Sequence, residues 1–141
     1  MKLLYIAGPL FNSHERHYLE AIAAAFEQRG FKTFLPHRDA GVITEWGDAT
    51  RKRVFAADLA ALDACDGCVA LLTGADHDSG TCVELGYLYA LGKPCFGLTD
   101  DLRSNTLNNM VWGVCDDGRR IARALDEVVG QVLLHFSAAG G

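Results

Sequence analysis

Residues Gly67–Thr73 read Gly-Cys-Val-Ala-Leu-Leu-Thr, a run without a charged side chain. The run has the length of a β-strand, and it is apolar throughout rather than only at alternate positions. A strand of this kind is typical of the centre of a parallel sheet, where helices cover both faces. The run therefore predicts an α/β fold with this segment near the middle of the sheet.

Outward from this run, strand-like and helix-like patterns alternate along the chain. The expected strands are about Lys2–Ala7, Phe31–Leu35 and Pro94–Leu98, and the expected helices are about Ser13–Gln28, Ala49–Ala64, Thr81–Leu91 and Arg119–His135. This alternation predicts a single flavodoxin-like domain, a parallel sheet with helices on both faces and strand order 2-1-3-4. We place a short fifth strand, if there is one, near Val111–Val114. The domain is expected to span residues 1–136, with 137–141 as a disordered tail.

The composition narrows the classes of function. The chain has 141 residues, of which 50% are hydrophobic and 22% charged, and a net charge of −5. This is enough apolar material for a proper core, and the missing basic surface argues against a nucleic-acid partner. There is no apolar stretch long enough to span a membrane and no signal peptide, so we expect a cytoplasmic protein.

The five cysteines are expected to be reduced thiols, because their number is odd and no export signal precedes them. Cys65 and Cys68 form a CxxC pattern. No second ligand pair at zinc spacing accompanies it, and the pattern leads into a strand rather than opening a helix. We therefore interpret these cysteines as buried packing residues, not as a metal or redox site.

Ligands of such sheets bind beyond the carboxyl ends of the strands. Asp78 follows the Gly67–Thr73 strand at this edge, and Glu84 comes six residues later. The spacing can bring both over one crevice, and glycosyl transfer uses such a pair. A helix N-terminus would also help to keep Glu84 ionised. The alternative is structural. Thr81-Cys82-Val83-Glu84 fits a capping box, which on spacing alone is the more frequent meaning of this pattern, and Asp78 would then be an ordinary loop residue.

Three segments resemble the nucleoside 2-deoxyribosyltransferases along most of the chain. They are Tyr5–Phe11 (Tyr-Ile-Ala-Gly-Pro-Leu-Phe), Asp78–Tyr87 followed by Ala90–Pro94, and Asn108–Gly113 (Asn-Asn-Met-Val-Trp-Gly). The second is the most specific, because many α/β proteins begin with an apolar strand and a glycine loop.

The resemblance implies a role for each matching residue. Glu84 would be the nucleophile that attacks C1′ of the deoxyribose, and Tyr5 would hold its carboxylate. Asp78 and Asp58 would lie near the nucleobase, and one of them would supply the proton to the departing base. Asn108 would bind the sugar hydroxyls in the neighbouring subunit's site.

Further residues complete the expected substrate site. Met110 would line the lent sugar pocket beside Asn108. By loop position, the substrate-binding candidates are Gly8, Phe11, Trp46 and Gly80. Each role has a structural alternative: a solvated helix face for Asp58, a core aromatic for Tyr5, a turn for Asn108, and packing for Met110, Phe11 and Trp46.

The expected reaction is base exchange on 2′-deoxynucleosides through a covalent deoxyribosyl-glutamate, with net retention and a role in nucleoside salvage. It needs no metal and no nucleotide cofactor. The expected partners are a deoxynucleoside, a free nucleobase and at least one further copy of the chain. Two alternatives remain. One is a nucleoside or nucleotide N-glycosidase of the same superfamily, and the other is a non-catalytic nucleotide-binding module.

Overall fold

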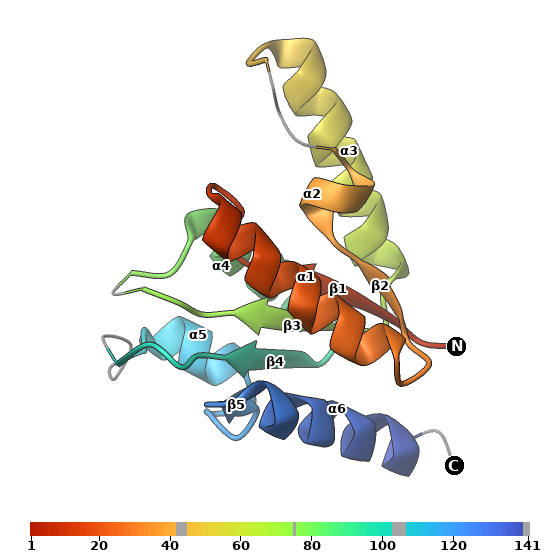
Figure 1. The fold of residues 1–141 in the computed structure, drawn as a ribbon, viewed down its shortest axis with the longest axis vertical. Helices are drawn as coiled ribbons and strands as arrows, with labels where there is room; N and C mark the ends of the chain where they lie inside the picture. Colours follow the sequence, from red (N-terminus) through yellow and green to blue (C-terminus); the bar gives the residue numbers. More distant parts are fainter. Residues whose placement is uncertain (42–44, 75, 103–106, 140–141) are drawn as a thin grey trace.

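The computed structural model describes residues 1–41, 45–74, 76–102 and 107–139. The chain forms a parallel sheet flanked by helices (Figure 1). The strands are β1 (Leu3–Ala7), β2 (Lys32–Phe34), β3 (Gly67–Leu71), β4 (Cys95–Leu98) and β5 (Ile121–Ala122). The helices are α1 (Ser13–Glu27), α2 (Pro36–Asp39), α3 (Asp48–Ala64), α4 (Ser79–Ala90), α5 (Asn109–Val114) and α6 (Leu125–Ala139).

The sheet order is β2-β1-β3-β4-β5, and every neighbouring pair is parallel. The central strand, β3, is buried at all of its positions, as its continuous apolar run predicts. The predicted flavodoxin-like α/β fold is therefore confirmed. All strand carboxyl ends meet at one edge of the sheet, which is where ligands of such folds bind.

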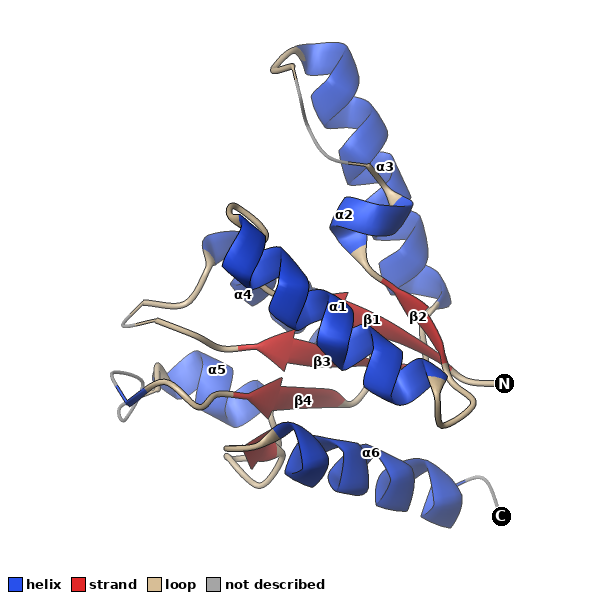
Figure 2. Cartoon of the chain, in the orientation of Figure 1, coloured by secondary structure: helices blue, strands red, loops and turns tan. Residues whose placement is uncertain are grey.

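Helices lie on both faces of the sheet (Figure 2), and an apolar cluster fills the space on each face. Leu4 and Ile6 of β1 pack with α1 and α6, whereas Tyr5 and Ala7 pack with α3, α4 and α5. Successive side chains of a strand point to opposite faces, so this division follows directly from the pleat. Tyr5 is thereby placed on the face that carries α4 and Glu84.

The segment after β4 differs from the sequence prediction. Residues Val111–Val114 belong to helix α5, and the fifth strand is Ile121–Ala122, which was expected to start the last helix. A turn with positive φ at Asp116, Asp117 and Gly118 separates the two elements. Because Ile121 fits the helical spacing of the following apolar residues, its strand was hidden in that pattern. At the other end, α6 continues to Ala139, beyond the predicted boundary at residue 136.

Helix α3 extends well beyond the sheet (Figure 1). Its carboxyl-terminal part packs on the sheet through Ala61 and Leu62. In the sequence, Phe55 fits the helical spacing of Val54, Leu59 and Leu62, which predicts a buried face, but 67% of it is exposed. The amino-terminal half of α3 therefore presents an aromatic side chain outward. The short helix α2 precedes α3 in the chain.

Candidate active site

The centre of the site is a hydrogen bond from the hydroxyl of Tyr5 to Oε2 of Glu84. Tyr5 is fully buried in β1, and Glu84 lies in α4 on the same side of the sheet. Two elements far apart in the sequence thus fix one carboxylate. The predicted contact between these residues is present, and Tyr5 is at once a core aromatic and a ligand of Glu84.

The capping-box interpretation of Glu84 is wrong. The residue that caps α4 is Asp78, whose Oδ2 accepts from the backbone N–H of Thr81 at 2.9 Å and from its hydroxyl at 2.9 Å. Thr81 is therefore inside the helix rather than at its cap. Since Asp78 satisfies the helix end, the carboxylate of Glu84 is free to face Tyr5.

Burial raises the pKa of Glu84 to about 7, the nearby charges of Asp58 and Asp78 add to this rise, and the hydrogen bond from Tyr5 opposes it. We expected the helix N-terminus to keep this carboxyl ionised. Because α4 begins at Ser79, Glu84 lies beyond the first turn, where the helix dipole has little effect. Desolvation therefore dominates, and Glu84 gains and loses its proton near neutral pH.

Asp58 is the second carboxyl of the site. It lies on α3, half-buried, and its Oδ1 is buried without a hydrogen-bond partner among the described residues. Burial raises its pKa to about 6. A solvated helix face would not do this, so the structural alternative for Asp58 does not hold. An acid with a raised pKa beside a reacting group is the usual arrangement for proton transfer.

Tyr5 is held by neighbours that sequence reasoning missed. Its ring stacks on Phe34 of β2, with centroids 5.4 Å apart, and in the β1–β3 register it pairs with Cys68. Burial and the neighbouring Glu84 both raise the pKa of Tyr5, so its phenol stays protonated and donates to the carboxylate. The only signal for these neighbours is the strand register, which a single sequence does not reveal.

The four substrate-binding candidates fall into different environments. Gly8 has φ +158°, and a Cβ there would lie 2.7 Å from Cδ2 of Leu19 and 3.0 Å from Cβ of Leu71, so a side chain at this position would have to displace its neighbours. Gly80 is in the first turn of α4, beside Asp78. Phe11 and Trp46 are each 72% exposed, which rules out packing as their role within this chain. The guanidinium of Arg51 lies 5.0 Å from the centre of the Trp46 ring.

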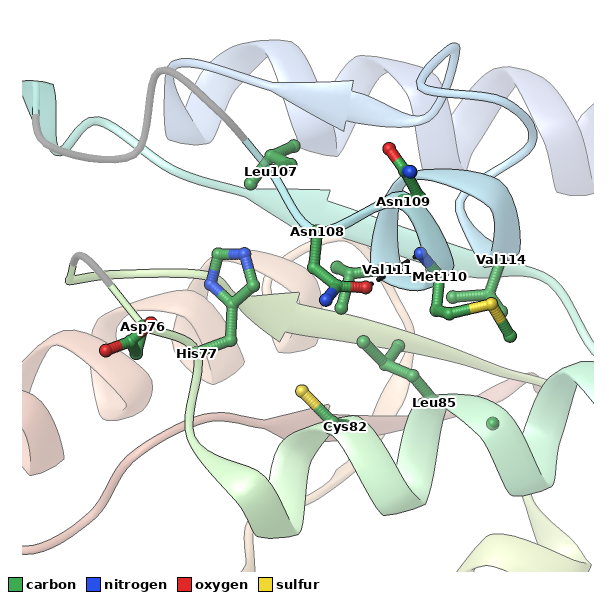
Figure 3. A pocket seen from close by; sticks show the side chains of 11 residues that line it. Asp76, His77, Cys82, Leu85, Leu107, Asn108, Asn109, Met110, Val111 and Val114 are labelled. Atoms are coloured by element: carbon green, nitrogen blue, oxygen red, sulfur yellow. Dashed lines mark hydrogen bonds between the residues drawn. The ribbon is translucent and has the colours of Figure 1, made fainter.

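Asn108 and Met110 lie at the start of α5. Asn108 caps α5 by accepting from the backbone N–H of Met110 at 2.8 Å, and Met110 is 76% exposed. Both line a cavity of about 720 Å³ between α4 and α5 (Figure 3). Cys82 and Gly86 line the same cavity from α4, whereas Glu84 does not.

The cysteines, possible metal-binding groups and helix lengths bear on the redox, metal and membrane interpretations. All five cysteines are free, and Cys65 and Cys68 are buried in the apolar layer, as expected for packing residues. In the described ranges, no group of three or more His, Cys, Asp or Glu side chains is placed to hold a metal ion. No helix in these ranges is long and apolar enough to cross a bilayer.

Solved structures with this fold include three informative neighbours. A conserved protein of Enterococcus faecalis V583 superposes with a TM-score of 0.82 at 23% identity, covering 96% of this chain and 99% of that one. A 2-deoxyribosyltransferase of Bacillus psychrosaccharolyticus gives 0.76 at 23% identity, with 89% of both chains covered. The CMP N-glycosidase BcmB of Clostridium botulinum gives 0.62 at 17% identity, covering 93% and 98%. At these identities the likeness establishes the fold.

Sequence comparisons are more specific. An uncharacterized protein of Schizosaccharomyces pombe is 31% identical over 107 residues, which cover 71% of this chain and 51% of the relative. The chain thus spans about half the length of that relative. The family model described as nucleoside 2-deoxyribosyltransferase matches residues 4–128, which include every predicted site residue. The chain belongs to the nucleoside 2-deoxyribosyltransferase family.

Proposed function

We propose that the protein exchanges the base of 2′-deoxynucleosides through a covalent deoxyribosyl-glutamate intermediate, with Glu84 as the nucleophile. The observation that carries this proposal is the largely buried Glu84, held by the hydroxyl of Tyr5 and close enough to Asp58 and Asp78 for their charges to raise its pKa. A helix cap would need none of these features. Covalent glycosyl transfer needs a fixed carboxylate and a separate acid.

The reaction has two balanced steps. In the first, a carboxylate oxygen of Glu84 bonds to C1′ while the C1′–N bond breaks, and an acid protonates the departing base. In the second, a ring nitrogen of a new base bonds to C1′, the ester bond to Glu84 breaks, and the proton of the incoming base returns to the acid. Each step inverts C1′, so the exchange gives net retention.

We assign the proton transfer to Asp58. Its pKa is raised to about 6 by burial, and its Oδ1 has no hydrogen-bond partner within the described part of the chain. Asp78, by contrast, has one oxygen committed to Thr81. Asp78 then fixes the start of α4 and adds negative charge near the sugar. That charge disfavours a substrate with a 5′-phosphate and favours free nucleosides.

The preference for 2′-deoxy sugars follows from the chemistry of C1′. The transition state resembles an oxocarbenium ion, and an electron-withdrawing 2′-hydroxyl raises its energy. A site without special contacts to that position therefore still reacts faster with deoxynucleosides. We further propose that Gly8, Phe11, Trp46 and Gly80 surround the substrate, and that Asn108 and Met110 are supplied by a second copy of the chain.

Hydrolysis is the second candidate. The fold is shared with the CMP N-glycosidase of Clostridium botulinum, whose name describes an N-glycosidic hydrolysis. The same covalent Glu84 would serve if water, rather than a base, attacked C1′. Transfer and hydrolysis differ only in the second step, so one experiment separates them.

The test incubates the protein with 2′-deoxyinosine plus adenine, and with thymidine plus adenine, with Glu84→Ala as the control. Chromatography would show 2′-deoxyadenosine as the product, absent with the variant, and the donor that reacts would define the base class. Release of hypoxanthine or thymine without a new nucleoside would assign a hydrolase. No reaction with either donor or with 5′-monophosphates would sink the enzymatic proposal.

A further inference from the structure

Helix α3 carries Asp58, yet its buried residues lie near its carboxyl end. Of its 17 residues, only Ala61 and Leu62 are buried. Its amino-terminal half extends beyond the sheet (Figure 1), where Arg53 donates a hydrogen bond to the carbonyl of Ala40 at 3.0 Å. The position of Asp58 therefore depends on what fixes the carboxyl end of this helix.

Two side chains fix this end to the neighbouring helix α4. The hydroxyl of Tyr87 on α4 donates to Oδ1 of Asp63. Nζ of Lys93, just after α4, donates to the backbone carbonyls of Leu62 and Asp63 at 2.8 and 2.6 Å. The last carbonyls of a helix lack partners within the helix and carry partial negative charge, so an ammonium group stabilises them. We call Tyr87, Asp63 and Lys93 the α3–α4 clamp.

The end of α4 holds Lys93 in place. Gly92 has φ +74°, and its backbone N–H donates to the carbonyl of Tyr89 at 3.0 Å. The backbone N–H of Lys93 donates to the carbonyl of Leu88 at 3.0 Å. A left-handed glycine with such hydrogen bonds is a common way for a helix to end. Lys93 is thus attached to α4 as firmly as Tyr87 is, and both sides of the clamp join α3 to this helix.

The clamp and the two site carboxyls, Asp58 and Glu84, lie on the same two helices and one turn apart. Tyr87 comes three positions after Glu84 on α4. Leu62, whose carbonyl accepts from Lys93, comes four positions after Asp58 on α3. Residues with these spacings are neighbours on one helix face. The two carboxyls are also close enough for the charge of Asp58 to raise the pKa of Glu84.

We propose that Tyr87 and Lys93 are positioning residues, which set the separation of the two site carboxyls by holding the carboxyl end of α3 against α4. Their role rests on the proposed function, in which Asp58 protonates the base and Glu84 attacks C1′. Asp58 lies about 7 Å along the helix from Asp63, so a tilt of about 10° at the clamp would move it by about 1 Å. A displacement of about 1 Å can slow a catalysed reaction roughly 100-fold.

The first test is kinetic. Tyr87→Phe removes one hydrogen bond of the clamp and keeps the ring. With 2′-deoxyinosine, kcat should fall about 10- to 100-fold, whereas KM should stay within about two-fold of native. With 7-methyl-2′-deoxyguanosine, whose base leaves as a neutral molecule without a proton, kcat should stay near native, because the displaced group is the acid Asp58. Tyr89→Phe is the matched control, since it makes the same change at a tyrosine of α4 that is 61% exposed. It should behave as the native chain does.

The acceptor side of the clamp provides a conservative rescue. Asp63→Asn keeps a side-chain oxygen for the Tyr87 hydroxyl and should keep near-native kcat, whereas Asp63→Ala should match Tyr87→Phe. Combining Asp63→Ala with Tyr87→Phe should lose no more than either change alone, because both remove the same hydrogen bond. Lys93→Met removes the other half of the clamp and should change both reactions in the same direction as Tyr87→Phe.

The second test needs no substrate. It follows the ¹³C signal of the Glu84 carboxyl by NMR as the pH is changed. Besides burial and the hydrogen bond from Tyr5, the charges of Asp58 and Asp78 shift the pKa of this carboxyl. Moving Asp58 away weakens its effect, so the pKa of Glu84 should fall in both clamp variants and stay native in the control. The alkaline limb of the pH–rate profile should move to lower pH with it.

The opposite results would overturn the positioning role. If Tyr87→Phe leaves kcat and the pKa of Glu84 unchanged, or slows both donors equally without changing that pKa, the clamp only supports the fold. A rise in KM at constant kcat would place Tyr87 in the substrate pocket instead. If the native chain transfers no deoxyribose, yet the clamp variants lower the pKa of Glu84, the positioning role holds and the proposed function fails.

Discussion

The hydroxyl of Tyr5 donates a hydrogen bond to Oε2 of Glu84, joining the first strand to helix α4 across 79 positions of sequence. The bond stabilises the ionised carboxylate, whereas burial opposes it. The proton affinity of Glu84 is thus set by a balance between these two effects. Substituting Tyr5 changes the hydrogen bond, and substituting Glu84 removes the buried carboxyl.

Replacing Tyr5 with Phe removes the donor and keeps the ring that packs on Phe34. The pKa of Glu84 should rise further, because the Tyr5 hydrogen bond lowers it. A hydrogen bond to a charged group contributes about 1.5–3 kcal/mol, so kcat/KM at pH 7 should fall roughly 10- to 100-fold. Because the pKa of Glu84, about 7, lies above that of Asp58, about 6, the alkaline limb of the pH–rate profile follows Glu84 and should move to higher pH. An unchanged profile would show that Tyr5 only supports the fold.

The native enzyme should show a bell-shaped dependence of kcat/KM on pH. Activity requires ionised Glu84, with a pKa of about 7, and protonated Asp58, with a pKa of about 6. Activity therefore rises as Glu84 loses its proton and falls as Asp58 loses its own, with the maximum between pH 6 and 7. The two limbs report apparent values of the coupled pair. A profile that is flat from pH 5 to 8 would contradict this pairing.

The role of Asp58 as the acid can be separated from that of Glu84 with a donor that needs no proton. The base of 7-methyl-2′-deoxyguanosine departs as a neutral molecule without protonation. With 2′-deoxyinosine, Asp58→Asn should lose about 100- to 10,000-fold in kcat, the usual contribution of general acid catalysis. With the methylated donor it should stay within a few-fold of native, whereas Glu84→Ala should lose both reactions.

Asp78 provides the matched comparison for that experiment. Asp78→Asn keeps a side-chain oxygen that can cap α4 at Thr81. If Asp58 is the acid, the Asp78 variant should lose activity equally with both donors or not at all. If instead Asp78→Asn loses activity with 2′-deoxyinosine but keeps it with the methylated donor, and Asp58→Asn does not, Asp78 is the acid.

The fold was predictable from the sequence because its main signals are local. The continuous apolar run that contains β3 and the alternation of elements predict a parallel sheet with the observed strand order. The sequence pattern did not predict the strand β5. Two residues make no recognisable strand pattern, and Ile121 fits the spacing of the helix that follows.

The site was predictable only in part. Spacing alone favoured a capping box at Thr81 and Glu84, and only the resemblance to a family favoured catalysis. The structure excludes the capping box, because Asp78 supplies the cap itself. The exposure of Phe55 was missed because helical spacing identifies an apolar face but not what covers it. Contacts made by the strand register, such as Tyr5 with Cys68, are likewise absent from local patterns.

Glu84→Gln should stabilise the protein at high pH. Folding raises the pKa of Glu84 from about 4.5 to about 7, so the folded state favours the protonated form. The stability from this carboxyl is complete below pH 4.5 and lost as pH rises through 7. Gln resembles the neutral form at every pH. The folded-to-unfolded difference in pKa corresponds to about 3 kcal/mol, which is the upper limit of the gain.

Thermal unfolding of both proteins at pH 5 and pH 8 checks this expectation. The variant should have the higher Tm at pH 8, and the difference should shrink at pH 5. Activity should be lost at both values, since Gln is not a nucleophile. Equal Tm differences at the two pH values would show that the pKa of Glu84 is not raised by folding.

The lent role of Asn108 predicts complementation between two inactive variants. Asn108→Ser keeps a residue that can cap α5 but shortens the side chain that would reach the sugar. When Asn108→Ser and Glu84→Gln are refolded together, some of the dimers contain one chain of each kind. In these dimers one site has Glu84 from the Asn108→Ser chain and Asn108 from the Glu84→Gln chain. With random pairing of an isologous dimer, about a quarter of the native activity should return. The control mixes Glu84→Gln with Asp58→Asn, two changes within the same subunit's site, and should restore nothing with 2′-deoxyinosine. If the Asn108 mixture also stays inactive while its dimers form normally, Asn108 serves its own chain or only caps α5.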